Sequence, residues 1–174
     1  MIIFLFLCIR FVPIEILNID IPFLSALLGN NFFSSLFVLL CFLFVINGAN
    51  LIDGFNGLLT INLIIINSIL AYINLADGIN EFSVVIIGQI IVLFSFLLFN
   101  FPGAKIFLGD SGSYLLGSLV ALNVIITNNL NPDYSSFFFC ILLFYLFFEV
   151  FFFFFRKILQ KKSPIHPDNE RLHM

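Results

Sequence analysis

Long apolar runs dominate the sequence and restrict the folds that the chain can adopt. Of its 174 residues, 61% are hydrophobic and only 10% are charged, with a mean hydropathy of +1.17. A single water-exposed domain of this size could not bury so much apolar surface. A helix needs about 20 mostly apolar residues to cross a bilayer, so we predict an all-α, polytopic membrane helical bundle with about five transmembrane helices. The predicted apolar spans are Phe32–Ile46, Leu58–Leu75, Phe82–Phe101, Ser113–Thr127 and Ser135–Phe155.

The N-terminal apolar stub, residues 1–9, is too short to cross a membrane before it reaches Arg10. It has neither the basic start nor the small-residue cleavage site of a signal peptide. We interpret it as the end of a helix whose beginning is missing. Residues 1–174 would then form one partial transmembrane domain of a longer protein.

The positions of basic residues predict the orientation of the bundle. Five of them follow the last span: Arg156, Lys157, Lys161, Lys162 and Arg171. By the positive-inside tendency, the tail 156–174 lies in the cytoplasm. Counting crossings backwards then places Asn47–Gly57 and Pro102–Gly112 on the same cytoplasmic face, so we predict one site built from these two loops and the tail.

The first loop contains polar side chains at regular spacing. Asn47, Asn50 and Asp53 recur every three residues, and they would share one helical face if the first span continues to about residue 51 or beyond. Carboxamides and a carboxylate there could bind a nucleobase or a sugar. The alternative is an interfacial turn in which Asp53 or Asn56 caps the helix that begins near Leu58.

The second loop ends in Gly109-Asp-Ser-Gly-Ser113 at the start of an apolar run. This pattern predicts a helix N-terminus, whose free N–H groups suit anions. Asp110 could cap that helix or bind Mg2+, which prefers carboxylate oxygens. Lys105 could neutralise a phosphate or simply mark a cytoplasmic helix end.

Other polar residues leave the functional class open. In the tail, His166, His173 and Arg171 could contact phosphates, or the tail could be an unstructured basic end on anionic lipid. Glu149 lies inside the last span, where an acid often has a functional role. A small polytopic transporter or a structural membrane subunit is therefore the alternative to an enzyme. Cys8, Cys41 and Cys140 lack metal-binding spacing and are expected to be buried small hydrophobic residues.

Taken together, the loops resemble the polyprenyl-phosphate N-acetylhexosamine-1-phosphate transferases, a glycosyltransferase family 4 type of enzyme. An Asn-x-x-Asn-x-x-Asp-Gly-x-Asp/Asn-Gly pattern is matched by Asn47, Asn50, Asp53, Gly54, Asn56 and Gly57. A Phe-x-Gly-Asp-x-Gly-Ser pattern is matched by Phe107, Gly109, Asp110, Gly112 and Ser113. A third, histidine-rich loop is matched in part by His166, Pro167, Asp168 and His173.

The resemblance implies an activity and a set of partners. An N-acetylhexosamine 1-phosphate would pass from a UDP-N-acetylhexosamine to polyprenyl (undecaprenyl) phosphate, releasing UMP and starting a cell-envelope glycan. The expected location is the bacterial inner (plasma) membrane, among membrane lipid, with the loops and C-terminus cytoplasmic. A homodimer is a candidate assembly, and no nucleic-acid partner is expected.

The resemblance also implies roles for single residues. Asp110 would be the Mg2+ ligand, and Asp110 and Asp53 the catalytic carboxylates. The nucleotide sugar would contact Asn47, Asn50, Asp53, Asn56 and Phe107, and the phosphates would contact Lys105, His166 and His173. The family's adjacent-aspartate loop, expected upstream, is absent from the sequence, so we expect the chain to be inactive alone.

Overall fold

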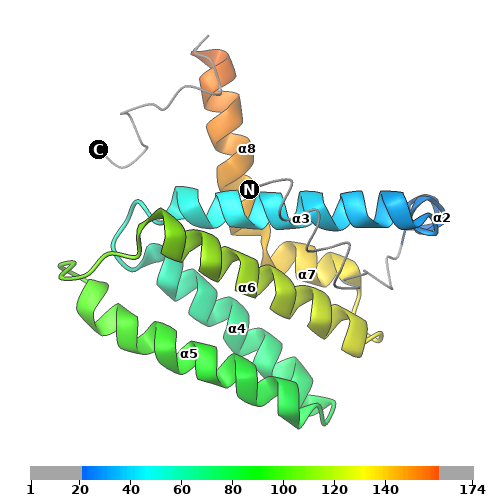
Figure 1. Ribbon diagram of the computed structural model, residues 1–174, viewed down its shortest axis with the longest axis horizontal. Helices are drawn as coiled ribbons and strands as arrows, with labels where there is room; N and C mark the ends of the chain where they lie inside the picture. Colours follow the sequence, from blue (N-terminus) through cyan, green and yellow to red (C-terminus); the bar gives the residue numbers. More distant parts are fainter. Residues whose placement is uncertain (1–20, 161–174) are drawn as a thin grey trace.

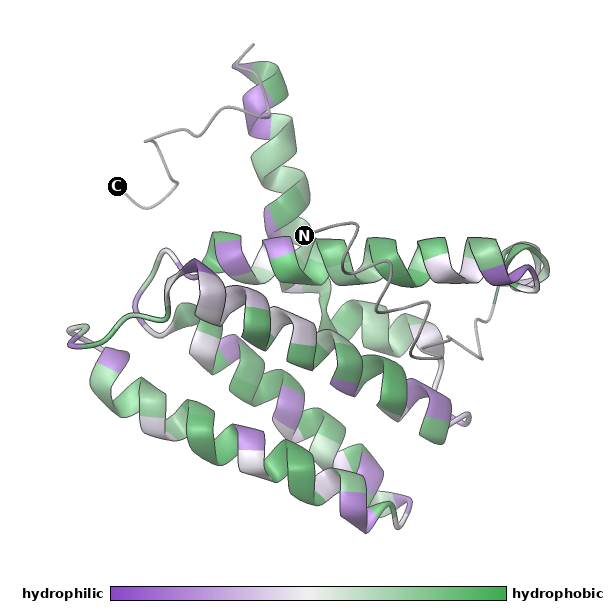
Figure 2. Ribbon diagram, in the orientation of Figure 1, coloured by the Kyte–Doolittle hydropathy of each residue, from purple (hydrophilic) through white to green (hydrophobic). Residues whose placement is uncertain are grey.

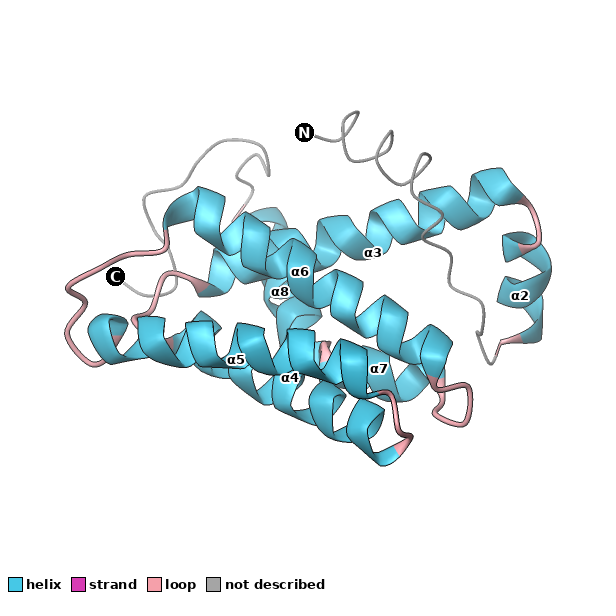
Figure 3. Ribbon diagram, turned by 60° about the horizontal axis from the view of Figure 1, so that its bottom comes forward, coloured by secondary structure: helices cyan, strands magenta, loops and turns pink. Residues whose placement is uncertain are grey.

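Residues 21–160 of a computed structural model are described here, and this part of the chain is helical without any strand (Figure 3). In chain order the helices are α2 (Pro22–Leu28), α3 (Asn31–Ile52), α4 (Leu58–Ala76), α5 (Asn80–Asn100), α6 (Gly109–Leu130), α7 (Ser136–Leu142) and α8 (Phe144–Leu159). Four of them, α3 to α6, are long and apolar enough to cross a membrane, and the bent pair α7–α8 brings the number to five if it counts as one span. The chain is therefore a multi-pass membrane protein with an all-α bundle, as predicted.

Short polar or glycine residues mark where several helices begin. The Asn30 side chain accepts a hydrogen bond from the Phe32 amide at 3.0 Å and caps α3. Ser135 caps α7 in the same way through the Phe137 amide, at 3.3 Å. Gly57 precedes α4 with a φ of 78°, a left-handed conformation that favours glycine. These capping residues and the glycine explain why long apolar runs with few polar residues still divide into separate helices that begin at defined residues.

Close backbone packing between α3 and α6 aligns the two helices (Figure 1). A Cβ atom added at Gly117 in α6 would lie 3.0 Å from both Ala49 Cβ and Ile46 Cα of α3. Small residues at such crossings let membrane helices approach closely. As Figure 1 shows, the α3–α4 turn and the α5–α6 loop lie at the same end of the bundle, as the crossing count predicted.

Buried and half-buried amide side chains connect the helices within the bundle. Asn123 in α6 donates to Asn67 Oδ1 in α4 at 3.0 Å and to Gln89 Oε1 in α5 at 2.7 Å. Nearer the opposite end, Asn74 in α4 donates to Thr127 Oγ1 in α6 at 2.9 Å. In Figure 2 hydrophilic positions of this kind interrupt the otherwise hydrophobic ribbons of α4, α5 and α6. Since lipid offers no hydrogen-bond partners, these mutual bonds favour one helix arrangement over others.

The predicted final span, Ser135–Phe155, is a bent pair of helices and not one continuous helix. Leu143 leaves the helical conformation, and α7 and α8 meet there at an angle of 63°. Gly48 of α3 packs against the main chain of Leu146, so closely that a Cβ atom would overlap the Leu146 carbonyl oxygen. The break lies where the start of α8 docks on α3. A helix interior without Gly or Pro gave no local signal of it.

Two further expectations need correction. Helix α6 runs from Gly109 to Leu130, beyond the predicted Ser113–Thr127 at both ends. Cys140 is exposed and Cys41 only half-buried, so neither is a fully buried small residue, because both border the cavity described below. Cys8 lies outside the described residues.

Candidate active site

The end of α3 carries the first group of polar side chains. The helix continues to Ile52, so Asn47 and Asn50 lie in its last turns and Asp53 directly follows it, which confirms the predicted extension. Asn47 is exposed, and its side chain donates to the Leu43 carbonyl one turn earlier at 2.6 Å. The apolar run thus ends in a polar helix terminus. It lies at the end of the bundle that carries the α3–α4 turn and the α5–α6 loop (the loop end).

The turn 53–57 leads into α4 through a glycine. Gly57 is the N-cap residue of α4 and has no side chain to cap the helix. Neither Asp53 nor Asn56 therefore occupies the N-cap position. Instead, Asn56 reaches across to the second loop and donates to the Pro102 carbonyl at 3.4 Å.

Asp110 lies in the first turn of α6, where it is exposed. It does not cap its own helix, since the N-cap residue is Leu108 and no side-chain capping bond forms. Its Oδ1 atom instead accepts a hydrogen bond from Asn50 Nδ2 at 3.1 Å. A carboxylate at a helix N-terminus is stabilised by the helix dipole. An exposed, oriented carboxylate at the loop end of the bundle is the result.

Ser113 completes a three-residue group with Asn50 and Asp110. Its fully buried hydroxyl accepts from Asn50 Nδ2 at 3.0 Å and donates to the Asp110 carbonyl at 3.0 Å. Both contacts of the Asn50 amide nitrogen are thus directed at α6. The group joins the two motif-bearing helices across 60 residues of sequence.

These groups can hold a hard divalent cation. Mg2+ commonly binds to one or two carboxylates and completes its shell with water and substrate phosphates. Asp110 provides an exposed carboxylate of that kind, with Asn50 fixing one oxygen and leaving the other side open to solvent. Within residues 21–160 no group of three or more His, Cys, Asp and Glu side chains forms an all-protein metal cage. The donor set therefore fits a cation shared with a phosphate ligand.

The α5–α6 loop presents an exposed aromatic ring and an exposed cation. The Phe107 side chain is 76% exposed, just before the start of α6. Lys105 is also exposed, and its main-chain amide bonds to the Phe99 carbonyl at 2.9 Å. Both predicted ligand contacts are therefore accessible on the loop that carries Asp110.

Asn100 is a site residue that the motifs did not reveal. It ends α5 and is 6% exposed. Its Oδ1 accepts from the Gly57 amide at 2.6 Å, and its Nδ2 donates to the Ile106 carbonyl at 2.8 Å. The available signal was an amide residue at the end of an apolar run, directly before Phe101 and Pro102.

Other predicted residues are not brought into this group. His166 and His173 lie outside the described residues. Glu149 lies in α8, where it interacts with Tyr145 one turn earlier. The acid that motivated a transporter as the alternative therefore has a partner within its own helix.

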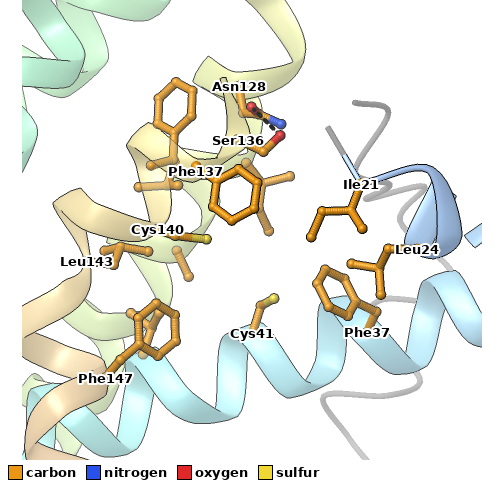
Figure 4. A pocket seen from close by; sticks show the side chains of 15 residues that line it. Ile21, Leu24, Phe37, Cys41, Asn128, Ser136, Phe137, Cys140, Leu143 and Phe147 are labelled. Carbon is orange, nitrogen blue, oxygen red and sulfur yellow. Dashed lines mark hydrogen bonds between the residues drawn. The ribbon is translucent and has the colours of Figure 1, made fainter. Parts of the chain in front are cut away.

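An apolar cavity of about 150 Å³ lies elsewhere, among α2, α3, α6, α7 and α8. Figure 4 shows the sulfur atoms of Cys41 and Cys140 directed into it, with Asn128 and Ser136 hydrogen-bonded at its edge. None of the lining residues belongs to the loops 47–57 or 100–113. Because its wall is almost wholly apolar, the cavity cannot supply the donors and acceptors that a nucleotide sugar requires.

Comparison with known proteins places the chain in a family of membrane-bound transferases. Residues 1–128 match the family described as Glycosyl transferase family 4, and the chain belongs to that family. No solved structure matches the chain.

Curated relatives carry more specific names. The phospho-N-acetylmuramoyl-pentapeptide-transferase of Leuconostoc mesenteroides is 40% identical over 114 residues, which cover 63% of this chain and 34% of the relative. The same enzyme of Clostridium perfringens is 34% identical over 109 residues, with the same coverage. The undecaprenyl-phosphate alpha-N-acetylglucosaminyl 1-phosphate transferase of Thermotoga maritima is 33% identical over 140 residues, 79% of this chain and 41% of the relative. The matched part thus spans about a third to two-fifths of each relative.

Proposed function

We propose that the chain forms the nucleotide-sugar-binding part of an enzyme that transfers an N-acetylhexosamine 1-phosphate from a UDP-sugar to polyprenyl phosphate. The observation that carries the proposal is the hydrogen-bonded group of Asn50, Asp110 and Ser113, which joins the two family motifs at one end of the bundle. Membership of Glycosyl transferase family 4 and the names of the relatives support it.

In the proposed reaction, an oxygen of the lipid phosphate attacks the β-phosphorus of the UDP-sugar. The bond from that phosphorus to the bridging oxygen breaks, and UMP leaves with the electron pair. Asp110 would hold Mg2+, and Asn50 would keep the carboxylate in one orientation. When bound, the metal offsets negative charge on the pyrophosphate. Asp53, next to the end of α3, is the second proposed catalytic carboxylate.

The loops divide the remaining work of binding. Phe107 would stack on the uracil ring, because its exposed aromatic ring offers a flat apolar face on which a flat base can lie. The side chains of Asn47 and Asn56 would contact the nucleotide sugar. Lys105, together with His166 and His173 of the tail, would contact phosphates.

The proposed location is the bacterial inner membrane with the loop end of the bundle in the cytoplasm. The basic residues Arg156 and Lys157 near the end of α8 support a cytoplasmic C-terminus. A homodimer belongs to the same proposal and is tested by the mass of the detergent-solubilised protein.

A membrane assay tests the reaction directly. Membranes from cells expressing the complete gene are supplied with UDP-N-acetylhexosamines, undecaprenyl phosphate and MgCl2, and UMP release is measured. We expect release that requires both substrates and stops when the divalent cation is chelated. Absence of lipid-dependent UMP release from correctly inserted protein would contradict the proposed function.

Phe107→Ala should weaken nucleotide binding without unfolding the bundle. Stacking of a base on an aromatic ring contributes about 1–3 kcal/mol, so the UMP dissociation constant should rise about 5-fold to 150-fold. Binding is measured by titrating UMP into the purified protein in nanodiscs. Phe94→Ala is the matched control, since Phe94 is also exposed but lies on α5 away from the loops. Equal UMP affinity in both variants would exclude stacking by Phe107.

Asn50→Ala should weaken metal binding through the loss of its bond to Asp110. Removing a residue that orients a metal ligand typically costs 10-fold to 100-fold in affinity, so we expect a loss of about that size. Mn2+ titration followed by electron paramagnetic resonance measures it in the presence of UDP. Ser118→Ala is the control, because the Ser118 hydroxyl bonds only within α6, to the Leu115 carbonyl. Unchanged Mn2+ affinity in Asn50→Ala would show that this amide does not orient the ligand.

A further inference from the structure

We propose that Asn100 is a positioning residue that couples the two loops of the candidate active site and so sets the affinity for the nucleotide. The ligand named here rests on the proposed function, whereas the coupling itself rests on the geometry alone. Asn100 belongs to neither family motif.

One buried amide group binds the backbone of both loops. Asn100 Oδ1 accepts from the Gly57 amide at 2.6 Å, at the last residue of the first loop. Asn100 Nδ2 donates to the Ile106 carbonyl at 2.8 Å, one residue before Phe107. With 6% of its surface exposed, the side chain lies beneath the loops. It therefore acts on the candidate site through its two contacts with the loop backbone.

The residue type matches this task. A side chain that bonds to the backbone of both loops needs an acceptor and a donor in one short, uncharged group, which a carboxamide provides. Removing it would leave a buried amide and a carbonyl without their partner, at a cost larger than the bond contributes when made.

The Gly57 amide is held in place by packing on its other side. Gly57 has a φ of 78°, and a Cβ atom there would lie 3.0 Å from Leu97 Cδ1 and from Phe101 Cβ. The turn therefore sits tightly on the end of α5. Without Asn100 it would have to lose a hydrogen bond or lift away from α5, which would shift Asn56 on one loop relative to Phe107 on the other.

The metal-side group has a separate attachment. Asn50, Asp110 and Ser113 are bonded to one another between α3 and α6 and make no bond to Asn100. Loss of Asn100 should therefore act mainly on nucleotide binding. In the transferase assay this means that KM for the UDP-sugar rises more than kcat falls.

Amide hydrogen exchange of the purified chain in nanodiscs tests the coupling without any ligand. In Asn100→Ala, exchange should accelerate in both segments, 53–57 and 101–108. In Asn100→Asp, the retained oxygen still accepts from Gly57 while the second oxygen faces the Ile106 carbonyl, so only 101–108 should accelerate. Asn74→Ala is the matched control: its amide is fully buried and bonded to Thr127, but lies toward the opposite end of α4, so neither segment should change.

UMP titration of the same proteins tests the effect on affinity. We expect the UMP dissociation constant to rise about tenfold in Asn100→Ala and to stay at the wild-type value in Asn74→Ala. Wild-type exchange rates in both segments of Asn100→Ala would overturn the coupling. Faster exchange with unchanged UMP affinity would overturn its role in binding. If the wild-type protein binds no UMP, the proposed function fails, and the exchange result still decides the coupling.

Discussion

Replacing Asp110 with Asn is expected to lower UMP release by the complete gene product at least about 100-fold, because the change removes the charge that would hold Mg2+. Losses of this size are typical when a preorganised electrostatic group is removed from an active site. The amide is nearly the same size as the carboxylate. Its oxygen can still accept the hydrogen bond from Asn50 Nδ2, which in the wild-type protein joins Asp110 Oδ1 at 3.1 Å. The fold should therefore persist while activity is lost.

Asp133→Asn is the matched control for this substitution. Asp133 is exposed in the turn between α6 and α7, at the opposite end of the bundle from Asp110. UMP release is measured over the first minutes at saturating UDP-sugar, with protein amounts equalised by quantitative blotting. If Asp110→Asn releases UMP at the rate of Asp133→Asn, Asp110 has no part in the mechanism.

Gly48→Ala is expected to destabilise the bundle by about 2 kcal/mol or more, even though alanine favours helices over glycine. The added Cβ would overlap the main-chain carbonyl of Leu146. A backbone atom cannot rotate away as a side chain can, so α8 would have to separate from α3. Overpacking of a well-packed contact costs about 1–3 kcal/mol.

Gly88→Ala separates this contact from the general effect of the substitution. Gly88 also lies inside a long helix, α5, but a Cβ atom there meets nothing within 4 Å. We expect equal or higher stability for Gly88→Ala, by up to about 1 kcal/mol. Thermal unfolding of the purified variants in one detergent compares them. A melting temperature of Gly48→Ala equal to that of Gly88→Ala would refute the tight α3–α8 contact.

The helices of the bundle were largely predictable because membrane crossing imposes a length and a composition on each one. The predicted spans at 58–75 and 82–101 differ from α4 and α5 by at most two residues at either end. The continuation of α3 past Ile46 was the condition for Asn47, Asn50 and Asp53 to share a helical face, and the helix continues to Ile52. The meeting of the two loops followed from counting crossings, and the bond between Asn50 and Asp110 agrees with it.

The contacts that complete the site were not predictable from local patterns. Whether Asp110 caps α6 or faces another group depends on where α3 lies, and the residues 109–113 contain no information on that. Asn100 bonds to residues 43 positions away on one side and 6 on the other. The amides of Asn67, Gln89 and Asn123 lie within apolar spans of the sequence, and their mutual hydrogen bonds form only where three helices meet.

The sequence by itself determined that this chain crosses a membrane several times and that its polar, glycine-rich loops belong to one family of transferases. Hydrophobic length and motif spacing are local properties, so they can be read along the chain. Only the tertiary structure decided that Asn50 orients Asp110, that Asn100 holds both loops, and that the last span breaks at Leu143. These outcomes depend on how closely helices that are distant in sequence approach one another. Gly48 and Gly117 allow close approach because a Cβ atom at either position would crowd the neighbouring helix.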